Sequence, residues 1–136
     1  MTLAIDLIKK HEGFRGMPYV DTEGYATIGY GTKLPLSKEE GERLLLSRMV
    51  ENRRELKLLF KNYDALDETR RAVLQNMHYN LGYSGLLSFK KFRAAVDKGN
   101  YDLAAHEMLQ SKWAVQVKGR ATTLAALMQS GDAAIA

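Results

Sequence analysis

Three side chains near the start of the chain have types and spacings that suit acid–base chemistry. Asp21 follows Glu12 by nine positions and Thr27 follows Asp21 by six, within the stretch HEGFRGMPYVDTEGYATIGYG. Cleavage of a glycosidic bond needs one carboxyl group that protonates the leaving oxygen and a second, ionised carboxyl group that activates water or stabilises the positively charged centre. The two acids can therefore form a glycosidase site. An ordinary surface acid at Glu12 and a turn-forming Asp21 are the alternative, which composition alone favours.

Other catalytic chemistries lack their motifs. The pairs His11-Glu12 and His106-Glu107 have no second histidine at the spacing of a zinc-binding HExxH helix. His78 stands alone on an amphipathic stretch and is expected to be a packed histidine, not a metal ligand. The sequence has no cysteine, and we find no nucleophile elbow, phosphate-binding loop or dinucleotide fingerprint. We therefore expect neither a metal nor a cofactor.

The composition indicates one globular domain that binds an anionic surface. The 136 residues are 46% hydrophobic and 26% charged, with a formal net charge of +4. The basic residues are scattered as doublets along the chain, which is more typical of solvated helix faces than of a nucleic-acid footprint. The first residues form an apolar run that Asp6 interrupts, so we expect neither a signal peptide nor a membrane span.

The pattern of apolar and turn residues predicts a small β lobe followed by helices. Residues 1–11 have helical periodicity, and β-prone runs on either side of the turn DTEG predict a hairpin within residues 12–36. The sequence SKEE from Ser37 to Glu40 is typical of a capping box and predicts a long helix over 37–59. Residues 60–136 are read as a helical bundle on which helix 1–11 packs. At the helix end we expect Glu12 to be partly buried, and in the turn we expect Asp21 to stay solvated and ionised.

The spacing of the three residues and their surroundings resemble the phage-type lysozymes, glycoside hydrolase family 24. The motif of that family is a glutamate, an aspartate after eight intervening residues, and a threonine after five more. Here Glu12, Asp21 and Thr27 match it, within the stretches EGFR and DTEGYATIGYG. The stretches LDETRRAVLQNMHYNLG and SKWAVQVKGRATTLAALMQSG resemble the central and late helices of the family. The resemblance covers nearly the whole chain. It implies an α+β, mostly α, lysozyme-like fold.

The resemblance also implies a muramidase that hydrolyses the β-1,4 bond between N-acetylmuramic acid and N-acetylglucosamine in peptidoglycan. Glu12 would be the general acid, while Asp21 and Thr27 would hold and activate water on the opposite face of the sugar, giving inversion.

Four further residues match family positions around that site. Arg120 matches an arginine that pairs with the catalytic glutamate. Three more fall where the family lines its sugar cleft: Gly31, Tyr79 and Asn80. For Tyr79 and Asn80 an ordinary role on the helix surface is an equal alternative.

Two departures from the family pattern concern the β lobe. Only residues 33–36 separate the glycine-rich end of the hairpin from the Ser37 cap, where longer members have an additional segment. Thr32 stands where many relatives have histidine, so a histidine-mediated salt bridge of this lobe is not expected. We expect a sheet reduced to little more than a hairpin and a more open cleft that holds the glycan less tightly.

Two other functions stay open at this stage. A lytic transglycosylase resembles lysozyme in fold but needs a single glutamate, and a non-catalytic wall-binding module would keep the fold without turnover. For the lysozyme interpretation, the expected partner is bacterial peptidoglycan, with no nucleic acid, no stable membrane insertion and a monomeric protein. We expect synthesis in the host cytoplasm and access to the cell wall through a lesion made by a separate holin.

Overall fold

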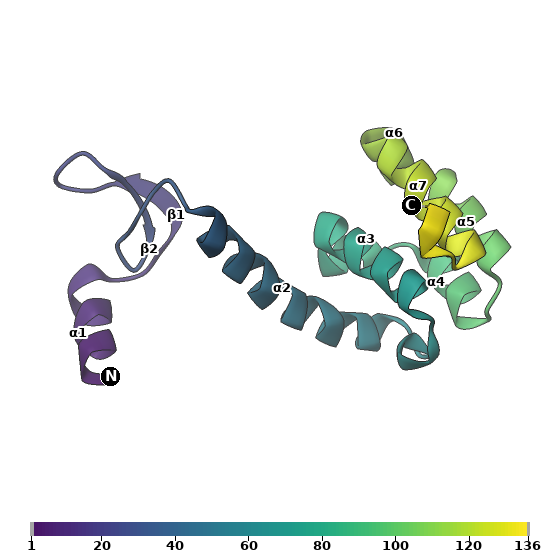
Figure 1. The fold of residues 1–136 in the computed structure, drawn as a ribbon, viewed down its shortest axis with the longest axis horizontal. Coiled ribbons are helices and arrows are strands. Elements are labelled where there is room, and N and C mark those ends of the chain that lie inside the picture. Colours follow the sequence, from purple (N-terminus) through teal and green to yellow (C-terminus); the bar gives the residue numbers. More distant parts are fainter. Residues whose placement is uncertain (1, 136) are drawn as a thin grey trace. The chain divides into compact units, whose positions relative to one another are not determined.

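The computed structural model describes residues 2–135, which are mainly helical with one small antiparallel sheet (Figure 1). Contacts divide the chain into two units, Met1–Leu45 and Leu46–Ala136. The first unit contains helix α1 (Thr2–Glu12) and strands β1 (Arg15–Val20), β2 (Ala26–Gly29) and β3 (Thr32–Lys33). Helix α2 (Lys38–Leu59) begins in the first unit and ends in the second. The second unit continues with η1 (Tyr63–Ala65), α3 (Glu68–Leu87), α4 (Lys90–Asp97), α5 (Tyr101–Leu109), α6 (Lys112–Val117), α7 (Gly119–Ser130) and η2 (Ala133–Ile135). This architecture confirms the predicted α+β, mostly helical class.

Helix α1 ends at a glycine cap. Gly13 has a left-handed backbone (φ +70°), and its N–H donates to the carbonyl oxygen of Lys9 at 2.9 Å. Such a residue satisfies a terminal carbonyl and turns the chain out of the helix, which glycine does without steric cost. The cap places Glu12 in the last turn of α1, immediately before the chain enters β1.

The sheet has one strand more than the predicted hairpin. Strand β1 pairs with β2 and β2 pairs with β3, both antiparallel, so that Thr27 lies opposite Tyr19 on one side and Lys33 on the other. The two-residue strand β3 has no hydrophobic alternation, and it was therefore invisible in the sequence pattern. Its position brings Lys33 beside the centre of the sheet.

Helix α2 begins with the predicted capping box. The Glu40 N–H donates to Ser37 Oγ at 3.1 Å, and the Ser37 N–H donates to Glu40 Oε1 at 2.9 Å. These reciprocal bonds satisfy two N–H groups that the first turn of a helix leaves without partners. The helix then runs for 22 residues.

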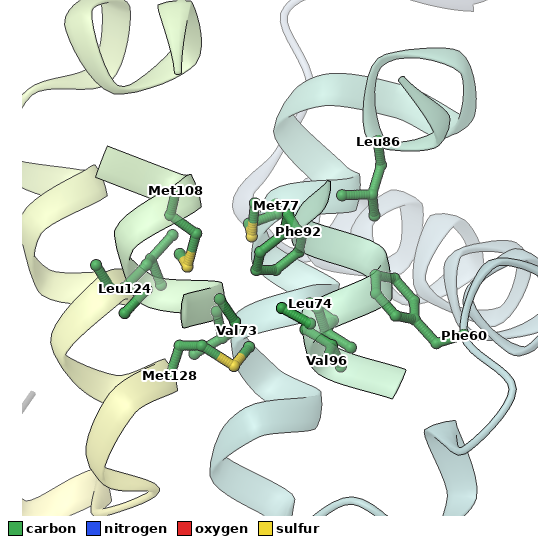
Figure 2. Packing of buried hydrophobic residues seen from close by; sticks show 14 of the residues in the cluster. Phe60, Val73, Leu74, Met77, Leu86, Phe92, Val96, Met108, Leu124 and Met128 are labelled. Atoms are coloured by element: carbon green, nitrogen blue, oxygen red, sulfur yellow. The ribbon is translucent and has the colours of Figure 1, made fainter. Parts of the chain in front are cut away.

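The helical unit has a continuous apolar core, part of which Figure 2 shows. Phe60 and Phe92 meet edge to face with ring centroids 6.1 Å apart, a favourable arrangement for aromatic pairs. Helix α5 packs against both α4 and α7. Small side chains are buried on two of these helices: Ala104 and Ala105 on α5, and Ala121 and Ala125 on α7. The largest fully buried apolar residues of the unit are Leu56, Phe60, Val73, Leu74, Met77, Leu86, Phe92, Val96, Met108 and Met128.

Helix α3 is interrupted near its C-terminal end. Gly82 leaves the helical conformation (φ 75°, ψ 174°), and helical geometry resumes from there to Leu87. Asp67 caps the start of α3 by accepting the Arg70 N–H at 2.9 Å. Tyr79 and Asn80 lie three and two positions before Gly82, so these two residues are in the last turn before the kink.

Candidate active site

Glu12 and Gly31 are in direct contact within the first unit. A Cβ atom added at Gly31 would lie 2.6 Å from both the Cδ and Oε2 atoms of Glu12, which is closer than any side chain tolerates. Gly31 also has a left-handed backbone (φ +75°) in the turn between β2 and β3. Only a glycine therefore fits this position without moving the Glu12 carboxylate. The structure brings together two of the residues that the sequence predicts for the site.

The Asp21 carboxylate is held by three donors. Lys33 Nζ donates to Oδ2 at 2.6 Å, while the N–H groups of Glu23 and Tyr25 donate to Oδ1 at 3.0 and 2.8 Å. The hydrogen bond from Lys33, followed by the Tyr25 N–H, holds the pKa of Asp21 below its usual range. Asp21 is therefore ionised at neutral pH, in the state that a base activating water requires.

Asp21 is less exposed than the sequence predicts. Within the first unit Glu12 is exposed, whereas the Asp21 side chain is only 19% exposed. Partial burial of Glu12 by the helical unit stays a prediction. Asp21 lies folded into its own turn, where the donors that cover its carboxylate also keep it charged. Its ionised state thus comes from hydrogen bonds more than from contact with solvent.

Thr27 occupies the centre of the small sheet and is 2% exposed. Its Oγ1 donates to the carbonyl oxygen of Tyr25 at 2.8 Å, which leaves the lone pairs of the hydroxyl oxygen free to accept a proton. The N–H of the same Tyr25 donates to Asp21 at 2.8 Å. The backbone of Tyr25 therefore links Thr27 to Asp21 and fixes the two predicted residues on one structural element.

The remaining predicted residues lie in the helical unit. Tyr79 and Asn80 are exposed on α3, and Arg120 is exposed near the start of α7. Asn80 Oδ1 accepts a hydrogen bond from Trp113 Nε1 at 2.8 Å, so its side chain has a fixed orientation. The pairing of Arg120 with Glu12 would join the two units and stays a prediction.

Two residues that position the site were not found from the sequence. Lys33 neutralises Asp21 from the neighbouring strand β3, and Trp113 orients Asn80. Neither residue had a signal in the sequence. Strand β3, which places Lys33 opposite Thr27, has no alternation of apolar residues, and the Trp113 contact spans 33 positions of the chain.

Metal ligands and membrane spans were also sought in the described part of the chain. Residues 2–135 contain no group of three or more His, Asp or Glu side chains placed to hold a metal ion. None of the helices over the same residues combines the length and apolar character needed to cross a membrane.

Comparisons with known proteins identify the family of this chain. The sequence model of the family described as phage lysozyme matches residues 9–130, which include all seven predicted site residues. The chain is 24% identical to probable T4-type lysozyme 1 of Dictyostelium discoideum, over 93% of both sequences. It is 27% identical to the pre-baseplate central spike protein Gp5 of Enterobacteria phage T4, over 93% of this chain but 28% of that protein. With a match to nearly its full length, the chain belongs to the phage lysozyme family and is a glycoside hydrolase.

Proposed function

We propose that this chain hydrolyses the β-1,4 bond between N-acetylmuramic acid and N-acetylglucosamine in bacterial peptidoglycan, with inversion, and thereby lyses the cell. One observation carries the proposal. Glu12, Asp21 and Thr27 lie in one compact unit of the chain, and Asp21 is held ionised by Lys33 while Tyr25 links it to Thr27. The family indicates the general reaction, and this geometry supports the proposal that these three residues carry it out.

In this mechanism Glu12 gives its proton to the glycosidic oxygen as the leaving group departs. Asp21 accepts a proton from a water molecule that attacks the anomeric carbon from the opposite face, and the Thr27 hydroxyl helps to orient that water. The bond between the anomeric carbon and the leaving oxygen breaks as the bond to water forms. Asp21 suits the role of base because its hydrogen-bond donors favour the charged form.

The names of the relatives support a lysozyme more than the alternatives. Two Dictyostelium relatives are named T4-type lysozymes, and a third relative is a phage spike protein that is much longer than this chain. A lytic transglycosylase uses a single glutamate and would have no use for an anchored Asp21. A non-catalytic wall-binding module would need neither acid.

The decisive experiment measures loss of turbidity of outer-membrane-permeabilised bacteria. Glu12→Gln and Asp21→Asn should each lower the rate at least about 100-fold, the contribution of a general acid or base. Glu23→Gln is the matched control, because it removes an exposed acid from the same turn and should leave the rate near that of the wild type. Full lysis by Glu12→Gln would contradict an enzymatic role and favour a wall-binding module.

Analysis of the products separates the two enzymatic mechanisms. Hydrolysis yields reducing ends, and NMR spectra recorded immediately after cleavage should show the anomer opposite to the β configuration of the substrate. Retention of the β anomer would overturn inversion, while anhydromuramic ends in the mass spectrum would identify a transglycosylase.

We also propose that the helical unit adheres to the anionic cell wall. Fourteen basic and nine acidic residues lie within Leu46–Ala136, whereas the first unit has six basic and seven acidic residues. An attraction of this kind weakens as salt screens the charges over roughly 8 Å at physiological ionic strength. Binding of the inactive Glu12→Gln variant to purified cell walls should therefore decrease steeply with added sodium chloride, and binding unchanged by salt would refute the proposal.

The proposal extends to the setting in which the enzyme works. It acts as a monomer without a cofactor, is made in the host cytoplasm and reaches the wall through a membrane lesion made by a separate holin. The shortened β lobe gives an open cleft that holds the glycan less tightly, so rates on soluble oligosaccharides should depend weakly on chain length. A strong preference for long oligomers would contradict the open cleft.

A further inference from the structure

A buried polar chain connects helices α2 and α3 inside the helical unit. Asn52 on α2 is 2% exposed and His78 on α3 is 8% exposed. Asn52 Nδ2 lies 3.0 Å from the carbonyl oxygen of Gln75 and 3.1 Å from His78 Nδ1, while His78 Nε2 lies 2.9 Å from Glu55 Oε1. The proposed hydrolysis uses none of these side chains, so the only buried histidine of the described chain has no assigned role.

The carbonyl of Gln75 determines the direction of every hydrogen bond in this chain. A backbone carbonyl only accepts, so the amide group of Asn52 must present its NH₂ group at this point. The same NH₂ group then donates its second hydrogen to His78 Nδ1, which must therefore be unprotonated. The imidazole proton is on Nε2, where it is donated to the carboxylate of Glu55. A neutral His78 with its proton on Nε2 thus satisfies all three contacts.

A second proton on His78 conflicts with this arrangement. The new N–H at Nδ1 would point at the NH₂ group of Asn52, and two donors cannot form a hydrogen bond. Rotation of the amide by 180° would offer Oδ1 to Nδ1, but Oδ1 would then face the Gln75 carbonyl oxygen, another acceptor. Asn52 Oδ1 already has no hydrogen-bond partner among the described residues. Protonation therefore costs one hydrogen bond in either orientation.

The carboxylates on α2 act in the opposite direction. Glu55 contacts the ring directly, and its side chain is partly exposed. Glu51 is hydrogen-bonded to Arg54, which is the main reason why the pKa of Glu51 lies below its usual range, and His78 is close enough to contribute. Two carboxylates and the guanidinium of Arg54 are thus the charged groups that α2 brings near the imidazole.

We propose that His78 is a proton-dependent latch between α2 and α3. The neutral imidazole holds Asn52 and closes the contact between the two helices. The imidazolium form loses its hydrogen bond with Asn52 and keeps an ion pair with Glu55. The contact between α2 and α3 therefore loosens when His78 is protonated at lower pH. Tyr79 and Asn80 follow His78 directly on α3, so the latch controls how firmly this segment is held.

The wild-type protein provides the first test. The ¹⁵N NMR spectrum of the intact chain at pH 8 should show His78 with an unprotonated Nδ1 and a protonated Nε2. His11 and His106 are exposed and serve as internal references, because they should show the usual mixture of tautomers. A protonated Nδ1 at this pH would overturn the proposal, and this measurement requires no variant.

Two substitutions should move the NMR titration midpoint of His78 in opposite directions. Asn52→Ala removes the NH₂ group that faces Nδ1 and should move the midpoint up. Glu55→Gln keeps an acceptor for Nε2 but removes the charge, and should move the midpoint down. Midpoints that stay unchanged, or that move in the same direction, would show that His78 is merely a packed histidine.

A stability measurement covers the case in which chemical shifts are broadened. The destabilisation caused by Asn52→Ala, measured by urea unfolding, should be larger at pH 8 than at pH 5. In a protein that also carries His78→Phe, Asn52→Ala should lower the free energy of unfolding by the same amount at both pH values. A cost that is independent of pH with His78 present would contradict the latch, whether or not the chain is an active lysozyme.

Discussion

Lys33 and Asp21 form an ion pair, with Nζ and Oδ2 2.6 Å apart, between strand β3 and the turn that follows β1. The lysine stands twelve positions after the aspartate, and the antiparallel pairing of β2 with β3 brings them together. The hydrogen bond from Lys33 is the main reason why the pKa of Asp21 is lowered. The strand that the sequence pattern missed therefore sets the charge of the candidate catalytic base.

Replacing Lys33 by methionine should raise the pKa of Asp21 toward its ordinary value. A base must be ionised to work, so the acid limb of the pH–activity profile should move to higher pH. Stability contributed by the ionised Asp21 is present above its unfolded-state pKa and is lost as the pH falls through the lower folded-state value. In the variant the folded-state pKa lies nearer the unfolded-state value, so this contribution should be smaller and its loss should be complete at a higher pH. Lys10→Met, an exposed lysine on α1, is the control and should leave both profiles unchanged.

Gly31→Ala should affect activity far more than stability. The added Cβ collides with the Glu12 carboxylate, so the general acid must move, and the rate of lysis should fall at least about tenfold. Gly29→Ala is the control, because Gly29 (φ +69°) has nearly the same left-handed backbone as Gly31 (φ +75°). A Cβ atom at Gly29 would meet no other atom within 4 Å. Both variants should lose about 1 kcal/mol of unfolding free energy, the cost of a left-handed alanine. Equal loss of activity in both would show that strain, and not the position of Glu12, is responsible.

Thr27→Val tests the hydroxyl group without changing the shape of the side chain. The substitution removes the bond to the Tyr25 carbonyl, which still accepts the Asp21 N–H at 2.9 Å, so the stability cost should be about 1 kcal/mol or less. If the hydroxyl orients water, kcat should fall about 100-fold with little change in KM. Thr27→Ser retains the hydroxyl and should recover most of the rate. A valine variant with full activity would remove Thr27 from the mechanism.

Trp113→Phe should weaken glycan binding through Asn80. The phenyl ring can keep the edge-to-face contact with Phe89, whose centroid is 6.4 Å from that of Trp113, but it cannot donate to Asn80. An unrestrained Asn80 should raise KM several-fold on oligosaccharides with little change in kcat, since the loss concerns binding and not chemistry. Asn80→Ala should give the same KM, and the double variant should show no further increase. Additive effects would mean that Trp113 acts independently of Asn80.

Local patterns predicted most of the elements. The Ser37 capping box and the helical periodicity of the first residues each depend on residues a few positions apart, and the structure has them where the sequence indicates. Contacts between distant residues were not predictable in this way. Asn52 and His78 are 26 positions apart, and neither their hydrogen bond nor the one from Trp113 to Asn80 leaves a periodic signal.

The contacts around Asp21 and Thr27 also determine how this part of the chain folds. The hydrogen bonds that hold the two residues join positions only two, four and twelve apart. Closing such short loops costs little chain entropy, and folding rates rise as contacts become more local. The β lobe can therefore order early and close again rapidly after a local opening. After such an opening the hydrogen bonds around Asp21 and Thr27 form again from residues of one short segment, without contacts from distant parts of the chain.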